Sequence, residues 1–252
     1  MAKIDLNADI GESFGPWVMG NDAALMEVIS SANVACGFHA GDPDVMAQTM
    51  RAAVANDVGI GAHPGFADLQ GFGRRRLNLS AEELTNLVTY QLGAAQAMAR
   101  AAGGAVRHFK LHGALSNMAS ENAEIARACY SAALKVQPEI ILVVLPQTAM
   151  EQVARDLQAN WAGEIFADRA YEDDASLVAR SKPGAVLHDA EEVGARIETM
   201  LRKGAIVTAS GKEIPCKIDT VCLHGDGAEA LAMARALRGH LTGAGFEIAP
   251  FG

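Results

Sequence analysis

Residues 31–43 of the chain read Ser-Ala-Asn-Val-Ala-Cys-Gly-Phe-His-Ala-Gly-Asp-Pro. The first six residues are mostly small or apolar and suit a buried strand, whereas the glycines on either side of His39 are typical of a turn. Asp42 and Pro43 then have the residue types of a helix N-cap and of the first helical position. The stretch therefore predicts a strand, a short turn and a helix, with a histidine at the carboxyl end of the strand.

The same order of strand and helix is repeated along the sequence. Its apolar runs predict strands at Ile4–Ala8, Ala32–Cys36, Val58–Ala62, Val106–Leu111, Ile140–Leu145, Glu164–Ala167, Ala185–Leu187 and Thr220–Leu223. Helical patterns lie near residues 22–30, 43–56, 81–102, 121–135, 147–158, 189–202 and 227–241. Uninterrupted alternation requires parallel strands joined by crossover helices. We therefore expect a closed parallel β/α barrel, with an open doubly wound sheet as the alternative.

One segment breaks this alternation. Residues 205–218 contain two short β runs around a Ser-Gly pair, which predict a small hairpin inserted before the last barrel strand. We find no linker, low-complexity segment or internal repeat in the sequence. We therefore predict a single domain over residues 1–252.

Composition limits the kinds of partner that the chain can have. Its formal net charge is −9, which argues against nucleic acid or an anionic membrane as the main partner. Four cysteines lie far apart or in apolar runs, without a Cys-x-x-Cys pair, as in a cytosolic protein with reduced thiols. The longest apolar run, residues 140–145, is far too short to span a bilayer. We expect a soluble cytoplasmic protein that acts on a small molecule.

Ionisable residues follow most of the predicted strands. In parallel α/β folds the active site gathers at the carboxyl ends of the strands. Six of the eight predicted strands end in such residues, which is the strongest sign of an enzyme here. The candidate catalytic residues at these ends are Asp9, Glu12, His39, His63, Lys110 and His112.

Their residue types suggest acid–base chemistry. Asp9 and Glu12 are candidates for a general base, because two acids beside one buried strand end are costly unless they are used. Period two places His108, Lys110 and His112 on one face of a strand. Three cations there would repel one another, so we expect His108 to be neutral and structural. Lys110 is then a candidate proton donor or oxyanion partner.

Other polar residues near the same ends are candidates for substrate binding. Two arginines belong to a Gly-Phe-Gly-Arg-Arg-Arg run, and a His-Gly-Asp-Gly run before the last helix could hold an anion on free amides. Both patterns are common in solvated loops and turns as well. The candidates are Asn7, Arg74, Arg75, Asp168, Arg169, His224, Gly225 and Asp226.

A divalent metal is a further possibility. Asp9, His39 and His63 at neighbouring strand ends would give an ion three ligands and leave a position open for water or substrate. The sequence lacks the His-Glu-x-x-His spacing that would make this assignment specific. It also lacks a P-loop, a Gly-x-Gly-x-x-Gly fingerprint and a Gly-x-Ser-x-Gly elbow.

Several longer motifs together resemble one family. They are Asp5-Leu-Asn-Ala-Asp-Ile-Gly-Glu12, the stretch 31–43, Gly61-Ala-His-Pro64 with Gly71-Phe-Gly-Arg-Arg75, Phe166-Ala-Asp-Arg-Ala-Tyr171, and Asp219-Thr-Val-Cys-Leu-His-Gly-Asp226. These motifs resemble the LamB/YcsF family nearly from end to end. The resemblance implies a seven-stranded, TIM-like barrel of the glycoside hydrolase/deacetylase type.

The resemblance also implies an activity. It points to the ATP-dependent opening of the lactam of 5-oxo-L-proline (pyroglutamate) to L-glutamate, carried out with two further subunits, B and C. Since the chain has no P-loop, we expect the partner subunits to bind most of the ATP and to phosphorylate the lactam oxygen. The barrel would then add water to the activated carbon.

The sequence departs from the family pattern near Lys110. The family usually reads Lys-Pro-His-Gly-Ala-Leu-Tyr-Asn, whereas this chain has Leu111 for the proline and Ser116 for the tyrosine. The lysine and histidine are kept. We expect a smaller and more polar pocket wall near Ser116.

Two other functions remain open at this point. A metal-dependent deacetylase or amidohydrolase, acting on a small amide or an N-acetyl sugar, would use the same barrel and strand ends. A non-catalytic subunit that positions an activated substrate would need no such cluster of acids and histidines.

Overall fold

The computed structural model describes residues 2–179, 181–223 and 228–251. Within them, a ring of parallel strands is closed by the pairing of β9 with β1. The strands of the ring, in order, are β1 (Ala2–Ile10), β2 (Ser31–Ala35), β3 (Gly59–His63), β4 (Val106–Phe109), β5 (Ile141–Val144), β6 (Trp161–Phe166) and β9 (Thr220–Leu223). The predicted parallel barrel, with seven strands, is confirmed.

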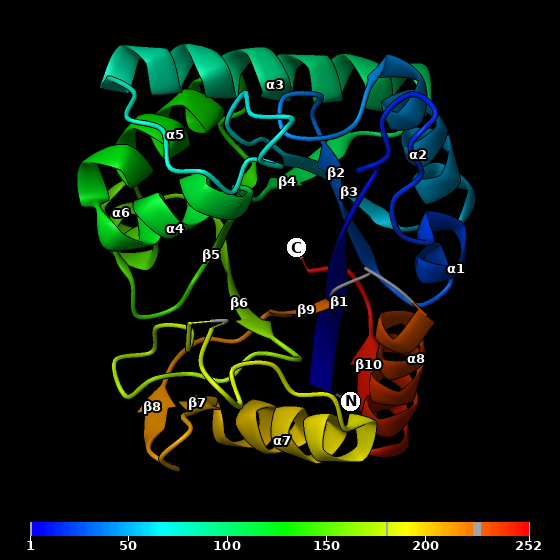
Figure 1. Cartoon of the computed structure of the whole chain (residues 1–252), viewed down its shortest axis with the longest axis vertical. Coiled ribbons are helices and arrows are strands. Elements are labelled where there is room, and N and C mark those ends of the chain that lie inside the picture. Colours follow the sequence, from blue (N-terminus) through cyan, green and yellow to red (C-terminus); the bar gives the residue numbers. More distant parts are fainter. Residues whose placement is uncertain (1, 180, 224–227, 252) are drawn as a thin grey trace.

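Helices surround this ring (Figure 1). They are α1 (Asp22–Met26), α2 (Pro43–Ala55), α3 (Ala81–Ala101), α4 (Gly113–Glu121), α5 (Ala123–Val136), α6 (Ala149–Asp156), α7 (Ala190–Lys203) and α8 (Ala228–Gly243). The carboxylate of Asp42 accepts hydrogen bonds from the first-turn amides of α2, and Pro43 is its first residue. The sequence pattern of stretch 31–43 therefore folds as predicted, because both cap and proline favour a helix start there.

Side chains alternate between two environments along each strand. On β1, Ile4 and Leu6 belong to the apolar core between strands and helices. The intervening Asp5 and Asn7 are also buried, but they bond to polar groups of neighbouring strands. The barrel thus has an apolar outer layer and a polar interior. That polar interior leads directly to the site described below.

Two predictions about elements are wrong. Ala185–Leu187 is not a barrel strand: only Val186 forms a bridge, antiparallel to Arg169, in the connection between β6 and α7. Its backbone is instead hydrogen-bonded within that connection, where Ala170 N–H donates to the Ala185 carbonyl and Leu187 N–H donates to the Asp168 carbonyl. Helix α4 lies where the sequence predicts no helix, and its N-cap residue His112 makes no side-chain capping bond.

The remaining strands lie outside the ring. β7 (Ala205–Val207) and β8 (Glu213–Pro215) form an antiparallel pair within the segment where the sequence predicts a hairpin. β10 (Phe246–Ile248) pairs in parallel with the start of β1. Beyond it, Phe251 packs edge-on against His108 inside the barrel, with ring centroids 5.1 Å apart. None of the helices described is both long and apolar enough to cross a membrane.

Candidate active site

The polar interior of the barrel is organised in layers, starting at the amino ends of the strands. The carboxylate of Asp5 accepts hydrogen bonds from Ser30 and Ser31, at 2.7 and 2.6 Å, and from Thr220. All four residues are buried. This layer ties the start of β1 to β2 and β9 and closes the lower end of the barrel.

An amide layer lies above Asp5. Asn33 donates to Asn7 at 2.7 Å, and the Nε2 atom of His108 lies 2.9 Å from the Asn33 oxygen. His108 fits because residue 61 is glycine: a Cβ there would lie 2.0 Å from the His108 ring. Burial lowers the pKa of His108 to about 3. His108 is therefore neutral and hydrogen-bonded, in agreement with the role predicted from its position.

Lys110 is the cation at the centre of the next layer. Its Nζ lies 3.0 Å from Asp9 Oδ1 and 2.7 Å from Glu164 Oε1, although the second contact is not aligned as a hydrogen bond. It also lies 3.3 Å from Asn7 Oδ1. Burial alone would lower the pKa of Lys110, but the acidic groups around it, Asp9 first, raise it well above the usual value. The lysine is therefore charged.

Asp9 is held in its ionised form by the same contacts. Burial would raise its pKa, yet His63 and Lys110 lower it well below the usual range. Asn33 also donates to Asp9 Oδ1, at 2.8 Å. Asp9 and Lys110 thus form a buried ion pair at the carboxyl ends of β1 and β4.

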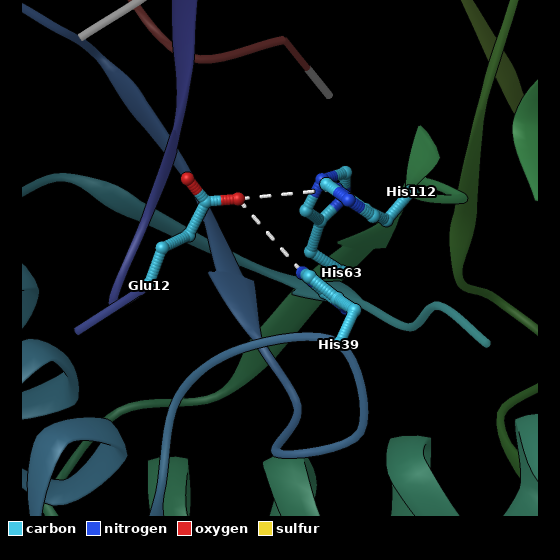
Figure 2. Close-up of side chains that lie close together, drawn as sticks. All are labelled: Glu12, His39, His63 and His112. Carbon is cyan, nitrogen blue, oxygen red and sulfur yellow. Dashed lines mark hydrogen bonds and ion pairs between the residues drawn. The ribbon is translucent and has the colours of Figure 1, made fainter. Parts of the chain in front are cut away.

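Four side chains gather above this ion pair: Glu12, His39, His63 and His112 (Figure 2). They come from the segments at the carboxyl ends of β1, β2, β3 and β4. Figure 2 shows the carboxylate of Glu12 pointing toward the imidazoles, with one oxygen 3.8 Å from both His39 Nε2 and His112 Nδ1. One ligand-type atom from each residue lies within 4.8 Å of the others.

The imidazole rings pack closely together. His39 and His112 stack with centroids 3.7 Å apart, and His63 meets both rings edge-on. Burial, together with the neighbouring histidines, lowers the pKa of His39 well below the usual value and that of His112 to about 3. Both rings are therefore neutral and offer nitrogen lone pairs.

This cluster differs from the metal set that the sequence predicts. His39 and His63 belong to it, but Glu12 and His112 take the place of Asp9. The Asp9 oxygens contact Lys110, Asn33 and His63 instead. A position at the carboxyl end of a strand predicts that residues lie at the same end of the barrel. It does not predict which of their side chains meet at one point.

A cavity of about 1170 Å³ opens above the ion pair and the cluster. Asp9, Glu12, His63, Lys110 and His112 all line it, whereas His39 is fully buried behind them and is not part of the lining. The catalytic residues predicted from the sequence are thus brought together, with His39 supporting the wall. Ser116, a small polar residue, also lines the cavity.

The predicted binding residues have different surroundings. Arg74 and Arg169 line the cavity. Arg75 is not among the lining residues, and it pairs with Asp68. The guanidinium of Arg169 donates to the carbonyls of Val178 and Ala185, so it also holds the connection between β6 and α7 in place.

Other members of that set lie away from the cavity. Asn7 is buried below Lys110, and Asp168 does not line the cavity. The predicted anion-binding run of His224, Gly225 and Asp226 falls outside the residues that the structure describes.

Sequence reasoning missed Glu164 and Asn33, which complete the polar interior. Both are buried within strands and contact Lys110 or Asp9 directly. The available signal was a charged or amide residue inside an apolar run, which has to be paired when it is buried. Arg76, which pairs with Glu121, also lines the cavity without having been predicted.

Known proteins resemble this chain over nearly its whole length. The 5-oxoprolinase A subunit of Ruegeria pomeroyi is 59% identical over 251 residues, covering 100% of this chain and 99% of that protein. A lactam utilization protein from Thermus thermophilus, solved by crystallography, has a TM-score of 0.94 at 42% identity, covering 99% of this chain and 100% of that one.

A more distant match shows the fold alone. The catalytic domain of a peptidoglycan N-acetylglucosamine deacetylase from Eubacterium rectale has a TM-score of 0.51 at 11% identity, over 99% of this chain and 88% of that one. The barrel is thus of the deacetylase-like type. The sequence model of the LamB/YcsF family matches residues 4–252, and the chain belongs to that family.

Proposed function

We propose that this chain is the catalytic component of an ATP-dependent 5-oxoprolinase, which opens the lactam of 5-oxo-L-proline with water to give L-glutamate. The observation that carries the proposal is the ion pair of Asp9 and Lys110, 3.0 Å apart at the base of a cavity. Lactam opening needs a group that accepts a proton from water and one that delivers a proton to the ring nitrogen. An ionised carboxylate beside a charged lysine supplies both.

The two proton transfers support each other. Water adds to the phosphate-activated ring carbon while Asp9 accepts its proton, and the bond from that carbon to the ring nitrogen then breaks, leaving an acyl phosphate that a second water hydrolyses to the carboxylate and inorganic phosphate. Lys110 donates a proton to the departing nitrogen. The charge on Lys110 is a main reason that the pKa of Asp9 is low, so loss of the lysine proton makes Asp9 a stronger base. Glu12, at the same cavity wall, is the other candidate for the base.

The surroundings of the ion pair provide electrostatic support. The activated carbon carries a phosphorylated oxygen, and fixed cations near the negative charge of this group lower the barrier to the attack of water. Lys110 is the buried cation at the base of the cavity, while Arg74, Arg76 and Arg169 line its walls. We propose that arginines of this wall, Arg74 first, hold the substrate carboxylate or a phosphate.

ATP enters the proposal through partner subunits B and C. The chain has no P-loop sequence, and glutamate recloses readily to the lactam, so the driving force has to come from outside the barrel. We assign phosphorylation of the lactam oxygen to the partners and water addition to this chain.

The four cysteines of this chain are free thiols, which supports a place in the cytoplasm.

The mouth of the barrel has a surface that suits such partners. Trp17 and Val18, in the loop after β1, are 67% and 83% exposed. Leu69 and Tyr90 are also exposed, and Tyr90 stacks on Phe38 of the loop after β2. Large apolar side chains exposed around one end of a protein suit a surface that binds another protein. We call Trp17, Val18, Leu69 and Tyr90 the apolar rim. A partner bound to the apolar rim would lie beside the cavity, where it could deliver an activated substrate.

The test is glutamate release from 5-oxoproline in a mixture of ATP and both partner subunits. We expect glutamate only when this chain is added, and none when ATP is omitted. If the complete mixture forms no glutamate, the proposal is wrong.

The buried histidine cluster favours a second candidate, a metal-dependent deacetylase or amidohydrolase. This second function predicts that the chain releases acetate from an N-acetyl sugar, or hydrolyses a small amide, without ATP. It also predicts that a chelator abolishes this hydrolysis. ATP-dependent glutamate release that persists in a chelator would exclude it as the main activity.

A further inference from the structure

Backbone contacts fix the hydrogen positions of two histidines in the cluster. His63 Nδ1 lies 2.8 Å from the carbonyl oxygen of Lys110, and His112 Nε2 lies 2.8 Å from that of Phe72. A carbonyl only accepts hydrogen bonds, so each of these nitrogens carries the hydrogen. Metal binding requires rings without the second proton, and in that state His63 Nε2 and His112 Nδ1 both present lone pairs.

These two lone pairs meet at one place. His63 Nε2 and His112 Nδ1 are 3.0 Å apart. Asp9 Oδ2 lies 3.2 Å from the same His63 nitrogen, and Glu12 Oε1 lies 3.8 Å from the His112 nitrogen. The repulsion between these lone pairs and carboxylate oxygens is relieved either by a proton on His63 Nε2 or by a cation bound among them.

His39 supplies an independent observation. It is fully buried, and neither of its ring nitrogens has a hydrogen-bond partner within the described part of the chain. A buried polar atom without a partner is costly, so such an atom commonly marks a ligand position. His39 is stacked on His112 with the two rings nearly parallel. Nitrogen lone pairs of the two rings therefore lie next to each other. The Nε2 atom of His39 lies 3.8 Å from Glu12 Oε1.

We propose that Glu12, His39, His63 and His112 bind one divalent transition-metal cation of the Zn²⁺ class. Tetrahedral ligands about 2.0–2.1 Å from Zn²⁺ are separated by roughly 3.4 Å. The ligand atoms in this cluster lie 3.0 to 3.8 Å apart along the contacts given above, and all lie within 4.8 Å. Three imidazoles and one carboxylate select a cation of this class over Mg²⁺, which prefers oxygen ligands.

The surrounding contacts match a metal site. Metal-bound histidines commonly donate their second ring hydrogen to a carbonyl or carboxylate, which orients the ring. His63 and His112 both do so, toward Lys110 and Phe72. A cation here would act as a Lewis acid at the cavity wall, next to Asp9 and Lys110. The proposal stands apart from lactam opening, because binding is measured without substrate.

The test uses the tag-free full chain after treatment with a chelator and gel filtration. Titration with Zn²⁺, followed by calorimetry and by thermal unfolding, should show one equivalent bound and a raised melting temperature. Co²⁺ should give visible absorption bands typical of a histidine-rich site, whereas Mg²⁺ should produce no shift.

Variants locate the site. His63→Gln, His112→Gln and Glu12→Gln should each weaken Zn²⁺ binding at least 100-fold, and Glu12→Gln keeps the size of the side chain in case a histidine variant fails to fold. His188→Gln, at an exposed histidine outside the cluster, should bind as the wild type does. Absence of stoichiometric Zn²⁺ binding would overturn the proposal, and so would unchanged binding in the cluster variants.

Discussion

Asp5 is a carboxylate buried at the lower end of the barrel, where water does not reach its charge. Burial raises its pKa from 3.8 to about 6, although hydrogen bonds from Ser31, Thr220 and Ser30 act in the opposite direction. Between these two pH values the folded protein keeps a proton on Asp5 that the unfolded chain has lost. The contribution of Asp5 to stability is therefore full below pH 3.8 and is lost as the pH rises through 6.

The expected loss is about 3 kcal/mol, since each pKa unit corresponds to roughly 1.4 kcal/mol. Asp5→Asn removes this titration, so the variant does not lose this stability as the pH rises. The free energy of unfolding of the variant minus that of the wild type should therefore increase between about pH 4 and about pH 7.5, by up to about 3 kcal/mol. Urea unfolding across this pH range measures it. Asp44→Asn, at an exposed carboxylate, is the control, and a difference for Asp5→Asn that does not change with pH would contradict the account.

At this scale the sequence predicted the strand-end residues better than the residues inside strands. Asp9, His63 and Lys110 meet because the carboxyl ends of parallel strands share one end of the barrel. Glu164 and Asn33 were missed, because every residue of β2 and most of β6 are buried. Burial on both faces removes the alternation that would show which side chains face inward.

Among the structural elements, the turn that follows β3 packs directly on the histidine stack. Gly73 lies in this turn with a positive φ of 62°. A Cβ at Gly73 would lie 2.7 Å from His39 Cβ and 2.9 Å from His112 Cδ2. The position therefore requires glycine both for its backbone conformation and for the space that the rings occupy.

Gly73→Ala should lower the free energy of unfolding by on the order of 3 kcal/mol, since backbone strain and overpacking add. Gly211→Ala is a matched control, because this glycine also has a positive φ but a Cβ there would meet nothing within 4 Å. It should cost only the backbone term, about 1–2 kcal/mol. Equal losses in the two variants, measured by urea unfolding, would show that the turn does not press on the rings.

The errors at this scale have local causes. Ala185–Leu187 has the composition of a strand, but its backbone is used within the connection from β6 to α7, where Arg169 donates to the Ala185 carbonyl. Helix α4 begins at Gly113, a residue with positive φ and no side-chain cap before it. The usual signals for a helix start are absent there, so tertiary packing decides its position.

Across the whole molecule, the large exposed apolar residues are distributed unevenly. Of those in the described part of the chain, Trp17, Val18, Met19, Leu69 and Tyr90 lie near the mouth of the barrel, whereas Val54 is at the end of α2, near the other end. This asymmetry supports the proposed contact with partner subunits.

Trp17→Ser combined with Val18→Ser should therefore weaken assembly with the partners at least tenfold, because both side chains lose their apolar contact area. Size-exclusion chromatography of the mixed subunits measures it. Val54→Ser removes an exposed apolar side chain away from the rim and should assemble normally. Normal assembly of the double variant would place the interface elsewhere.

The most direct test of the central claim uses Asp9→Asn in the assembled complex, with glutamate release and complex formation measured on the same sample. Asparagine keeps the size of the side chain, and Lys110 retains its contact with Glu164, so the variant should fold and assemble. We predict that glutamate release falls by a factor of roughly 10² to 10⁴. Assembly with full glutamate release would contradict a catalytic role for Asp9 and its ion pair with Lys110.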